Sequence, residues 1–186
     1  VQDQDDHGQK NTLQNAAFYI LLGFTLLLPL FFIPSSIVSF QFSKSLFIGL
    51  IAVIALALYL ISVLKNGSIR YPKSKLLWVV PGVLVTYLLA ALFSEMPLSS
   101  LIGYGFEIST FSFVLILFVI MVLVAQLFTK KDRIFYTYLA YFVAFFLLAL
   151  FHFLRFLFGA DFLSFGFFPS LVSNTIGKWS DVAVFF

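Results

Sequence analysis

The sequence predicts an all-α membrane protein, a polytopic bundle of transmembrane helices. Of its 186 residues, 62% are hydrophobic and only 10% are charged, whereas a soluble domain is about 45–50% apolar with about 25% charged residues. This is more apolar surface than one core of this length can bury. Several stretches also reach the length of about 20 apolar residues that carries a helix across about 30 Å of hydrocarbon. The same composition excludes a disordered chain, a collagen-like repeat and a cationic nucleic-acid binder.

The first transmembrane span is expected at 16–32, after a polar cytoplasmic tail at 1–15. Its apolar run contains Pro29 and is closed by Pro34. The tail carries three aspartates where a cleavable signal peptide would be basic, so we interpret this span as a retained helix. The second span, 45–64, is the clearest of the predicted spans.

Three further spans follow. The third, 76–93, contains Pro81, which predicts a kink whose freed carbonyl neighbouring helices can satisfy. The fourth, 111–128, has only two polar interruptions, and the fifth, 134–158, is long and aromatic. The fifth also carries a histidine and an arginine near its far end.

Both chain ends indicate an incomplete transmembrane domain, 16–186. Residue 1 is Val and not Met, and the last five residues begin a fresh apolar run. We therefore expect a sixth span to start at about 182 and the protein to continue beyond Phe186. Cysteine is absent, which excludes disulfide frameworks, thiolate metal sites and cysteine nucleophiles.

The orientation follows from lysine and arginine in the short loops. Loop 65–75 holds four basic residues and loop 129–133 holds three, whereas loop 94–110 holds none. Because basic loops stay in the cytoplasm, the first two are predicted to be inner loops and the N-terminus cytoplasmic. The segments 35–44, 94–110 and 159–181 then face outward.

His152 and Arg155 are the strongest candidates for chemistry inside a span. They are three residues apart and therefore share one helical face. An ionisable residue within a span is energetically costly and therefore indicates a functional site. Arg155 lies about one turn before Phe158, so its side chain either extends to the interface or binds an anionic group such as a phosphate. His152 is either a hydrogen-bonded interior residue or a catalytic base.

The most polar outward segment is 174–181. Ser180 or Asp181 would cap the sixth helix, and Trp179 suits the membrane interface. Lys178 beside a helix N-terminus would attract an anion. We interpret the segment as a capped loop that could also contact a ligand.

The segment 101–107, Leu-Ile-Gly-Tyr-Gly-Phe-Glu, invites comparison with the filter of potassium channels. Only three residues match, and Pro97 leaves little room for the re-entrant helix that a filter needs. We interpret it as a glycine-bearing turn before the fourth span. No nucleotide-binding or hydrolase motif is present, and no carboxylate pair falls within one span, so no metal or other cofactor is expected.

Two outward segments resemble the N-terminal part of bacterial O-antigen ligase and polymerase-like membrane proteins. The segment 93–103 looks like the family's "Phe-Ser … Pro … Ser-Leu-x-Gly" stretch after the third helix. The segment 176–181 occupies the place of a Gly-Asn-Pro-Asn-like turn, but Asn-Pro-Asn is absent here, so no role of that turn carries over.

The resemblance implies a membrane glycosyltransferase, a ligase or polymerase, that works without a metal at the outer face of the bacterial cytoplasmic membrane. Its partners would be membrane lipids and an undecaprenyl-diphosphate-linked glycan, and its catalytic loop would lie outside this chain. By location and chemistry, Arg155 and Lys178 are the candidate diphosphate contacts. The alternative is a non-enzymatic integral-membrane transport or assembly subunit, and an ion channel is a third option.

Overall fold

A computed structural model describes residues 2–33, 40–66, 76–103, 108–159, 162 and 175 of the chain. All regular structure in these residues is helical, so the predicted all-α class is confirmed for them. The helices are α1 (Gln2–Leu27), α2 (Phe40–Asn66), α3 (Leu76–Leu92), α4 (Pro97–Ile102), α5 (Phe111–Leu127) and α6 (Lys131–Phe158).

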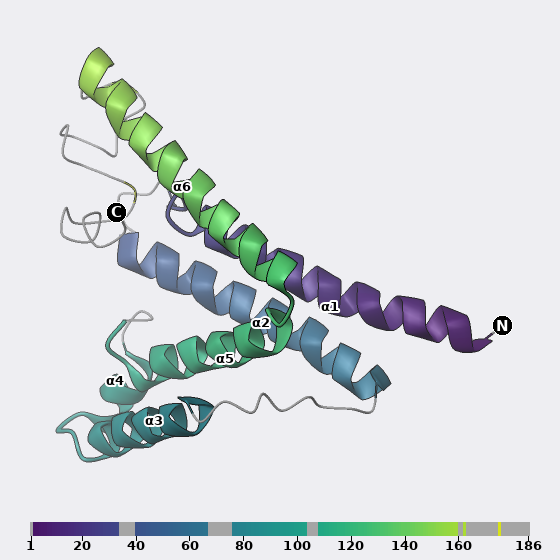
Figure 1. Cartoon of the computed structure of the whole chain (residues 1–186). Helices are drawn as coiled ribbons and strands as arrows, with labels where there is room; N and C mark the ends of the chain where they lie inside the picture. Colours follow the sequence, from purple (N-terminus) through teal and green to yellow (C-terminus); the bar gives the residue numbers. More distant parts are fainter. Residues whose placement is uncertain are drawn as a thin grey trace.

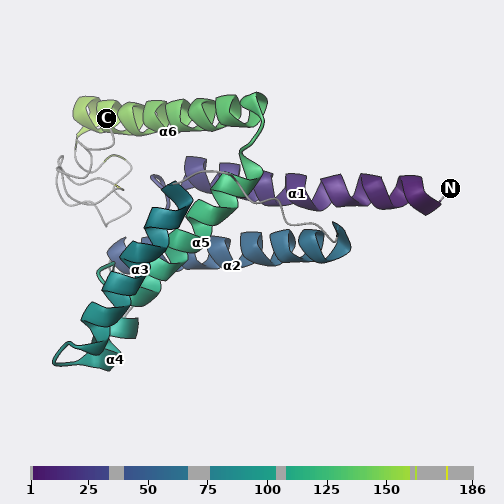
Figure 2. The same ribbon diagram turned by 60° about the horizontal axis from the view of Figure 1, so that its bottom comes forward.

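The helices pack in an order that differs from their order in the chain. Helix α1 lies between α2 and α6, α5 packs on the other side of α2, and α3 packs against α5 (Figure 1). The short helix α4 closes the α3–α5 hairpin and contacts both of its helices. Figure 2 shows that α1, α2 and α6 run roughly alongside one another, whereas α3 and α5 cross them obliquely.

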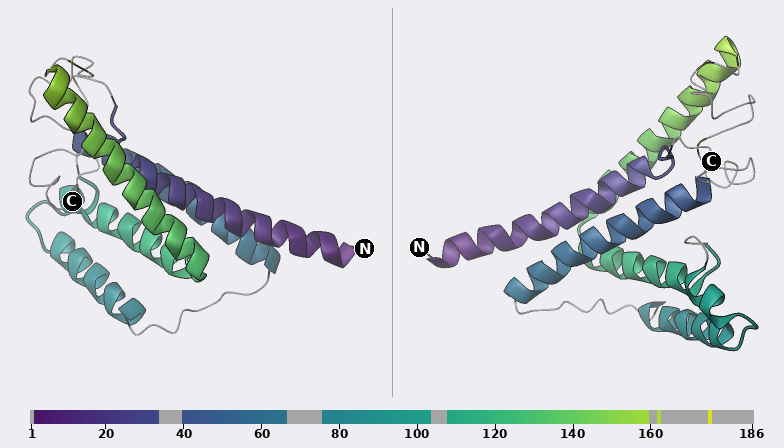
Figure 3. Two further views of the ribbon diagram at one scale, coloured as in Figure 1. Left: turned by 45° about the horizontal axis from the view of Figure 1, so that its top comes forward. Right: turned by 180° about the vertical axis from the view of Figure 1, so that it is seen from behind.

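Successive long helices alternate in direction, as helices that cross a membrane in succession must. The end of α2, the start of α3, the end of α5 and the start of α6 therefore lie toward one side of the bundle (Figure 3). Helix α4 and the end of α6 lie toward the opposite side. The second side holds the candidate site discussed below.

Within the part of the chain that the structure describes, two helices are long and apolar enough to cross a membrane, where the sequence predicted five complete spans. They cover Gln41–Lys65 and Lys131–Phe158. The other predicted spans correspond to shorter apolar helices, Thr12–Leu27, Val79–Leu92 and Phe111–Leu127. Helices α3 and α5 have 17 residues each, a length of about 26 Å that falls short of a hydrocarbon core of about 30 Å. The predicted start of a sixth span lies outside the described residues.

Helix α1 differs from the predicted span at both ends. It begins at Gln2, inside the predicted polar tail, and ends at Leu27 instead of at 32. The early end has a local cause, because Pro29 has no N–H to donate to the carbonyl four residues before it. A turn closes the helix there, with the N–H of Phe31 bonded to the Leu27 carbonyl at 2.8 Å. Helix α3, in contrast, continues through Pro81.

Four hydroxyl side chains within the helices donate to the backbone of their own helix. Thr86 shows this most clearly, because it is exposed and still donates inward to the Val83 carbonyl. A hydrocarbon solvent offers no hydrogen-bond partner, so polar groups on a lipid-facing helix must be satisfied in this way. The bonds are Thr25 to Leu21 at 3.0 Å, Ser45 to Gln41 at 2.9 Å, Thr86 to Val83 at 2.8 Å and Thr137 to Arg133 at 2.8 Å.

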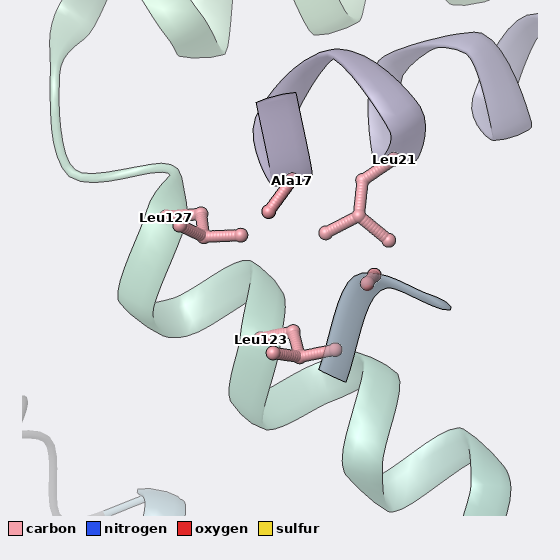
Figure 4. Packing of buried hydrophobic residues seen from close by; sticks show 5 residues of the cluster. Ala17, Leu21, Leu123 and Leu127 are labelled. Carbon is pink, nitrogen blue, oxygen red and sulfur yellow. The ribbon is translucent and has the colours of Figure 1, made fainter. Parts of the chain in front are cut away.

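The core lies where α1, α2 and α5 meet. In Figure 4, Ala17 and Leu21 of α1 point toward Leu123 and Leu127 of α5. Ala55 of α2 completes this buried cluster. The two alanines allow the backbones of α1 and α2 to approach closely, which is how helices associate when lipid replaces water.

Most of the remaining apolar surface is exposed. The chain has 12522 Å² of accessible surface, whereas a compact soluble monomer of 21.0 kDa would have about 9000 Å². In both long apolar helices, only 17% of the most apolar stretch is buried. A core helix of a soluble protein would be mostly buried, so these helices need an apolar solvent or a partner.

Arg133 joins three helices at the side where α6 begins. Its Nη1 donates to the Leu127 carbonyl at the end of α5, and its Nη2 donates to Oδ1 of Asn15 on α1, both at 2.7 Å. Its guanidinium carbon lies 4.9 Å from the ring centroid of Phe18, which packs edge-on against Phe128. One side chain thus satisfies a helix-terminal carbonyl, places a cation at a helix C-terminus and stacks on an aromatic ring.

We predict that Arg133→Ala lowers the free energy of unfolding by about 1–3 kcal/mol, because two hydrogen bonds and a cation–π contact are lost together. The measurement is unfolding of the purified protein in mixed micelles by titration with SDS, followed by circular dichroism. Lys131→Ala is the control, since it removes an exposed charge two residues away and should change the stability by less than about 0.5 kcal/mol. Equal losses of stability in the two variants would contradict the claim that Arg133 connects α6 to α1 and α5.

Candidate functional site

The buried residues of α6 lie on a single seam. They are Ala140, Ala144, Leu148 and Arg155, and their spacing of four, four and seven residues keeps them on one helical face. Helix α1 is the main described partner of α6. An arginine therefore continues a face that otherwise consists of small and apolar side chains.

Arg155 is completely buried, at 0% exposed. A side chain that extended to the membrane interface would be accessible, so this burial argues against that alternative. Its guanidinium carbon lies 5.6 Å from the ring centroid of Phe151, one turn earlier. The same ring meets the imidazole of His152 edge-on at 5.5 Å. The structure thus brings both predicted polar residues of this span together around one aromatic ring.

The end of α6 reduces the cost of burying this cation. Arg155 lies in the last turn, where the partial negative charge of the helix C-terminus favours a cation. Gly159 ends the helix with a φ of 95°, and its N–H bonds to the Arg155 carbonyl at 2.9 Å. Burial of an ionised group nevertheless costs several kcal/mol, so Arg155 remains a candidate functional residue.

Lys178, the other predicted diphosphate contact, lies outside the described residues, and so do Ser180, Asp181 and Trp179 of the predicted cap. Of the polar outer segment, Thr175 is described. It is only 5% exposed, and its hydroxyl makes no hydrogen bond within the part of the chain that the structure describes.

The segment that carries the family resemblance, 93–103, forms a turn followed by α4. Pro97 occupies the first turn of the helix, where its missing N–H costs nothing. The hydroxyls of Ser94 and Ser100 form a hydrogen bond of 2.8 Å within the segment. The Ser112 hydroxyl of α5 donates to the Leu101 carbonyl at 2.7 Å and so connects the segment to α5.

The sequence left little room here for the re-entrant helix of a channel filter. The structure has one short helix in this segment, the six residues of α4, Pro97–Ile102. That helix is only about 9 Å long. Gly103 ends it with a φ of 75° and a ψ of 171°, which agrees with the predicted glycine-bearing turn. Gly105, the other glycine of the filter-like sequence, lies outside the described residues.

An open pocket of about 390 Å³ lies against α4, on the side of the bundle toward which α6 ends (Figure 1). It is lined by apolar side chains, one hydroxyl and a glycine: Met96, Pro97, Leu98, Ser99, Ile102 and Gly103. A second pocket of about 260 Å³ lies between α3 and α5 and has only apolar side chains around it. Among the described residues, no ionisable side chain lines either pocket, so both suit hydrocarbon more than a polar reactant.

The comparisons with known proteins are negative: no protein-family model matches the sequence, and no curated protein or solved structure is similar to it. The resemblance to O-antigen ligase and polymerase-like proteins therefore depends on the two segments quoted above and stays a prediction. Among the described residues, no three His, Cys, Asp or Glu side chains form a group that could hold a metal ion.

We predict that Gly103→Ala destabilises the protein by about 1–3 kcal/mol, because a side chain strains the backbone at this combination of φ and ψ. Gly49→Ala is the matched control. Its new methyl carbon would lie 3.7 Å from Cδ1 of Ile116, an ordinary contact, and alanine favours the helix by up to about 1 kcal/mol. Unfolding in SDS would measure both variants, and a stable Gly103→Ala variant would contradict the strained turn.

Proposed function

We propose that this chain is a glycosyltransferase-like membrane protein of the O-antigen ligase or polymerase type. In this proposal the side of the bundle at which α6 ends binds the diphosphate of an undecaprenyl-diphosphate-linked glycan. The observation that carries the proposal is the guanidinium of Arg155, fully buried near the end of a long apolar helix. The segment 93–103, with its resemblance to the family, lies toward the same side.

The membrane setting is supported by the exposed apolar surface of α2 and α6 and by the inward hydrogen bonds of the hydroxyl groups. We extend it to five spans in the bacterial cytoplasmic membrane. Helices α3 and α5 are only about 4 Å shorter than the hydrocarbon core. Thinning of the bilayer accommodates such a mismatch at a cost of fractions of a kcal/mol per Å.

The orientation in this proposal places the N-terminus in the cytoplasm. Lys65 lies in the last turn of α2, Lys130 and Lys131 lie where α6 begins, and all three are exposed. Basic residues in short loops favour the cytoplasmic side. Arg155, 22 residues after Arg133 along α6, is then close to the outer surface, where the carrier presents its diphosphate after flipping.

The chemistry of Arg155 suits a diphosphate. Guanidinium offers a planar fork of N–H donors that matches two phosphate oxygens at once. Glycan transfer breaks the bond between the sugar and the diphosphate, so negative charge builds up on the leaving oxygen. A cation that is already fixed in a site without water stabilises this charge more than an exposed one would. The apolar pockets at α4 and between α3 and α5 are suitable for the polyprenyl chain.

The topology is directly testable because the chain has no cysteine. We predict that a cysteine at Met96, which is 66% exposed at the α4 side, reacts with a membrane-impermeant maleimide in intact cells. A cysteine at Lys131 should react only after the membrane is permeabilised. The opposite pattern would reverse the orientation, and equal labelling of both sites in intact cells would contradict the spanning bundle.

For the activity, we predict that Arg155→Ala lowers the rate of glycan transfer at least tenfold. Arg155→Lys should recover only part of the activity, because ammonium lacks the bidentate fork. Lys178→Ala should also weaken the apparent affinity for the donor. The assay uses the natural protein in proteoliposomes, with undecaprenyl-diphosphate-linked glycan as the donor and the labelled product as the readout.

Lys65→Ala serves as the control for loss of a positive charge, since Lys65 lies in the last turn of α2, and α2 ends toward the side of the bundle opposite the end of α6. Circular dichroism checks that each variant is folded. The alternative function, a transport or assembly subunit without chemistry, predicts that the folded Arg155→Ala and Lys178→Ala variants transfer glycan as the natural protein does. That result would overturn the proposal.

A further inference from the structure

The tip of the α3–α5 hairpin exposes large apolar side chains around α4 (Figure 1). Phe93, which directly follows α3, is 87% exposed, and Leu98 and Ile102 of α4 are 73% and 58% exposed. Leu98 and Ile102 are one turn apart and therefore share a helical face. No residue of α4 is buried. Exposed apolar groups that gather in this way mark a contact with lipid or with another protein.

Three hydroxyl groups around α4 are bonded within the hairpin. The Ser94 hydroxyl donates to the Ala91 carbonyl at 2.9 Å and forms a second hydrogen bond with the Ser100 hydroxyl at 2.8 Å. The Ser112 hydroxyl donates to the Leu101 carbonyl at 2.7 Å. A loop in water would expose its hydroxyls and bury its leucines. The tip has the reverse arrangement, which is the one that a hydrocarbon solvent requires.

The length of the hairpin helices determines the depth of this tip. Helices α3 and α5 have 17 residues each, or about 26 Å, against a hydrocarbon core of about 30 Å. Both also cross the other long helices obliquely (Figure 2), and an oblique helix spans less depth than an upright one. A hairpin that starts at the inner hydrocarbon boundary therefore brings α4 no farther than the outer boundary.

The surroundings of the tip favour lipid over a protein partner. The segment 93–103 contains one charged side chain, that of Glu95, which is exposed. The apolar surface of the tip continues along α3, where Val85, Leu89 and Leu92 are 53%, 47% and 50% exposed. In the proposed function this surface of α3 faces lipid, and hydrocarbon that covers it reaches the tip without a break.

We propose that α4 is an interfacial anchor, and that its face with Leu98 and Ile102 inserts among the acyl chains of the outer leaflet. Glu95 then lies at the level of the lipid headgroups, because its carboxylate requires water. Met96, next to it in the turn before α4, stays accessible to the maleimide of the topology experiment. This inference rests on the membrane setting and orientation of the proposed function, but it does not depend on glycan transfer.

The test uses single cysteines, which the cysteine-free chain allows. The variants are Leu98→Cys, Ile102→Cys, Glu95→Cys and, near the middle of α6, Phe146→Cys, which replaces a side chain that is 57% exposed. Each is labelled with the fluorophore NBD and reconstituted in vesicles of phosphatidylethanolamine and phosphatidylglycerol. Two quenchers are compared: iodide on both sides of the vesicles, and a phospholipid that carries a doxyl group on its acyl chain close to the headgroup or close to the chain end.

We expect the labels at positions 98 and 102 to lose most of their fluorescence to the shallow doxyl lipid and little to iodide. The reason is that iodide stays in water, whereas an inserted apolar face lies about 5–10 Å deep at the boundary between headgroups and acyl chains. The label at position 95 should be quenched mainly by iodide. The label at position 146 should be quenched mainly by the deep doxyl lipid. Circular dichroism checks that each variant is folded.

Two results would overturn the anchor while leaving the membrane setting intact, provided that the label at position 146 is quenched by doxyl lipid. If iodide quenches the labels at 98 and 102 as strongly as the one at 95, α4 faces water. If neither iodide nor doxyl lipid quenches them, a second copy of the chain or another protein covers α4. If iodide, and not doxyl lipid, quenches the label at 146, the membrane setting of the proposed function is itself wrong.

Discussion

The position of α6 depends on the contacts that Arg133 makes at its first turn. Helix α6 packs mainly against α1 among the described helices, and Arg133 bonds both to α1 and to the end of α5. The whole helix has 28 residues, Lys131–Phe158. Arg155 lies 22 residues after Arg133, about 33 Å along the axis. A small tilt of α6 at Arg133 would therefore move Arg155 several times farther than it moves the first turn of the helix.

The two arginines of α6 show how the same side chain serves opposite ends of a helix. Each lies over a phenylalanine ring, Phe18 for Arg133 and Phe151 for Arg155. Arg133 is partly accessible and uses its N–H groups on a carbonyl and an amide oxygen within the protein. Arg155 is buried, and in the proposed function its N–H groups meet a phosphate. The first arrangement stabilises the fold, whereas the second, in the proposed function, keeps a positive charge where an anionic ligand binds.

The sequence predicted the helices well because long apolar runs leave few alternatives, and it predicted their ends less well because ends depend on single residues. Pro29 ends α1 early, and Pro97 starts a short helix, α4, that was not among the predicted helices. The bond between Arg133 and Asn15 joins residues 118 positions apart, so no local pattern reveals it. The burial of Arg155 was equally hidden, because α6 is apolar on all sides and its periodicity does not indicate which face meets the protein.

The abundance of phenylalanine has more than one cause. Several of the 27 phenylalanines are exposed on α6, where they suit a lipid solvent. The rings of Phe18 and Phe151, in contrast, contact the guanidinium groups of Arg133 and Arg155. In hydrocarbon, a buried guanidinium has no water to stabilise it. An aromatic face is one of the few apolar surfaces that attracts positive charge. A phenylalanine-rich bundle can therefore hold arginines inside it at a lower cost than an aliphatic one, and this property is what a membrane site for an anionic lipid carrier requires.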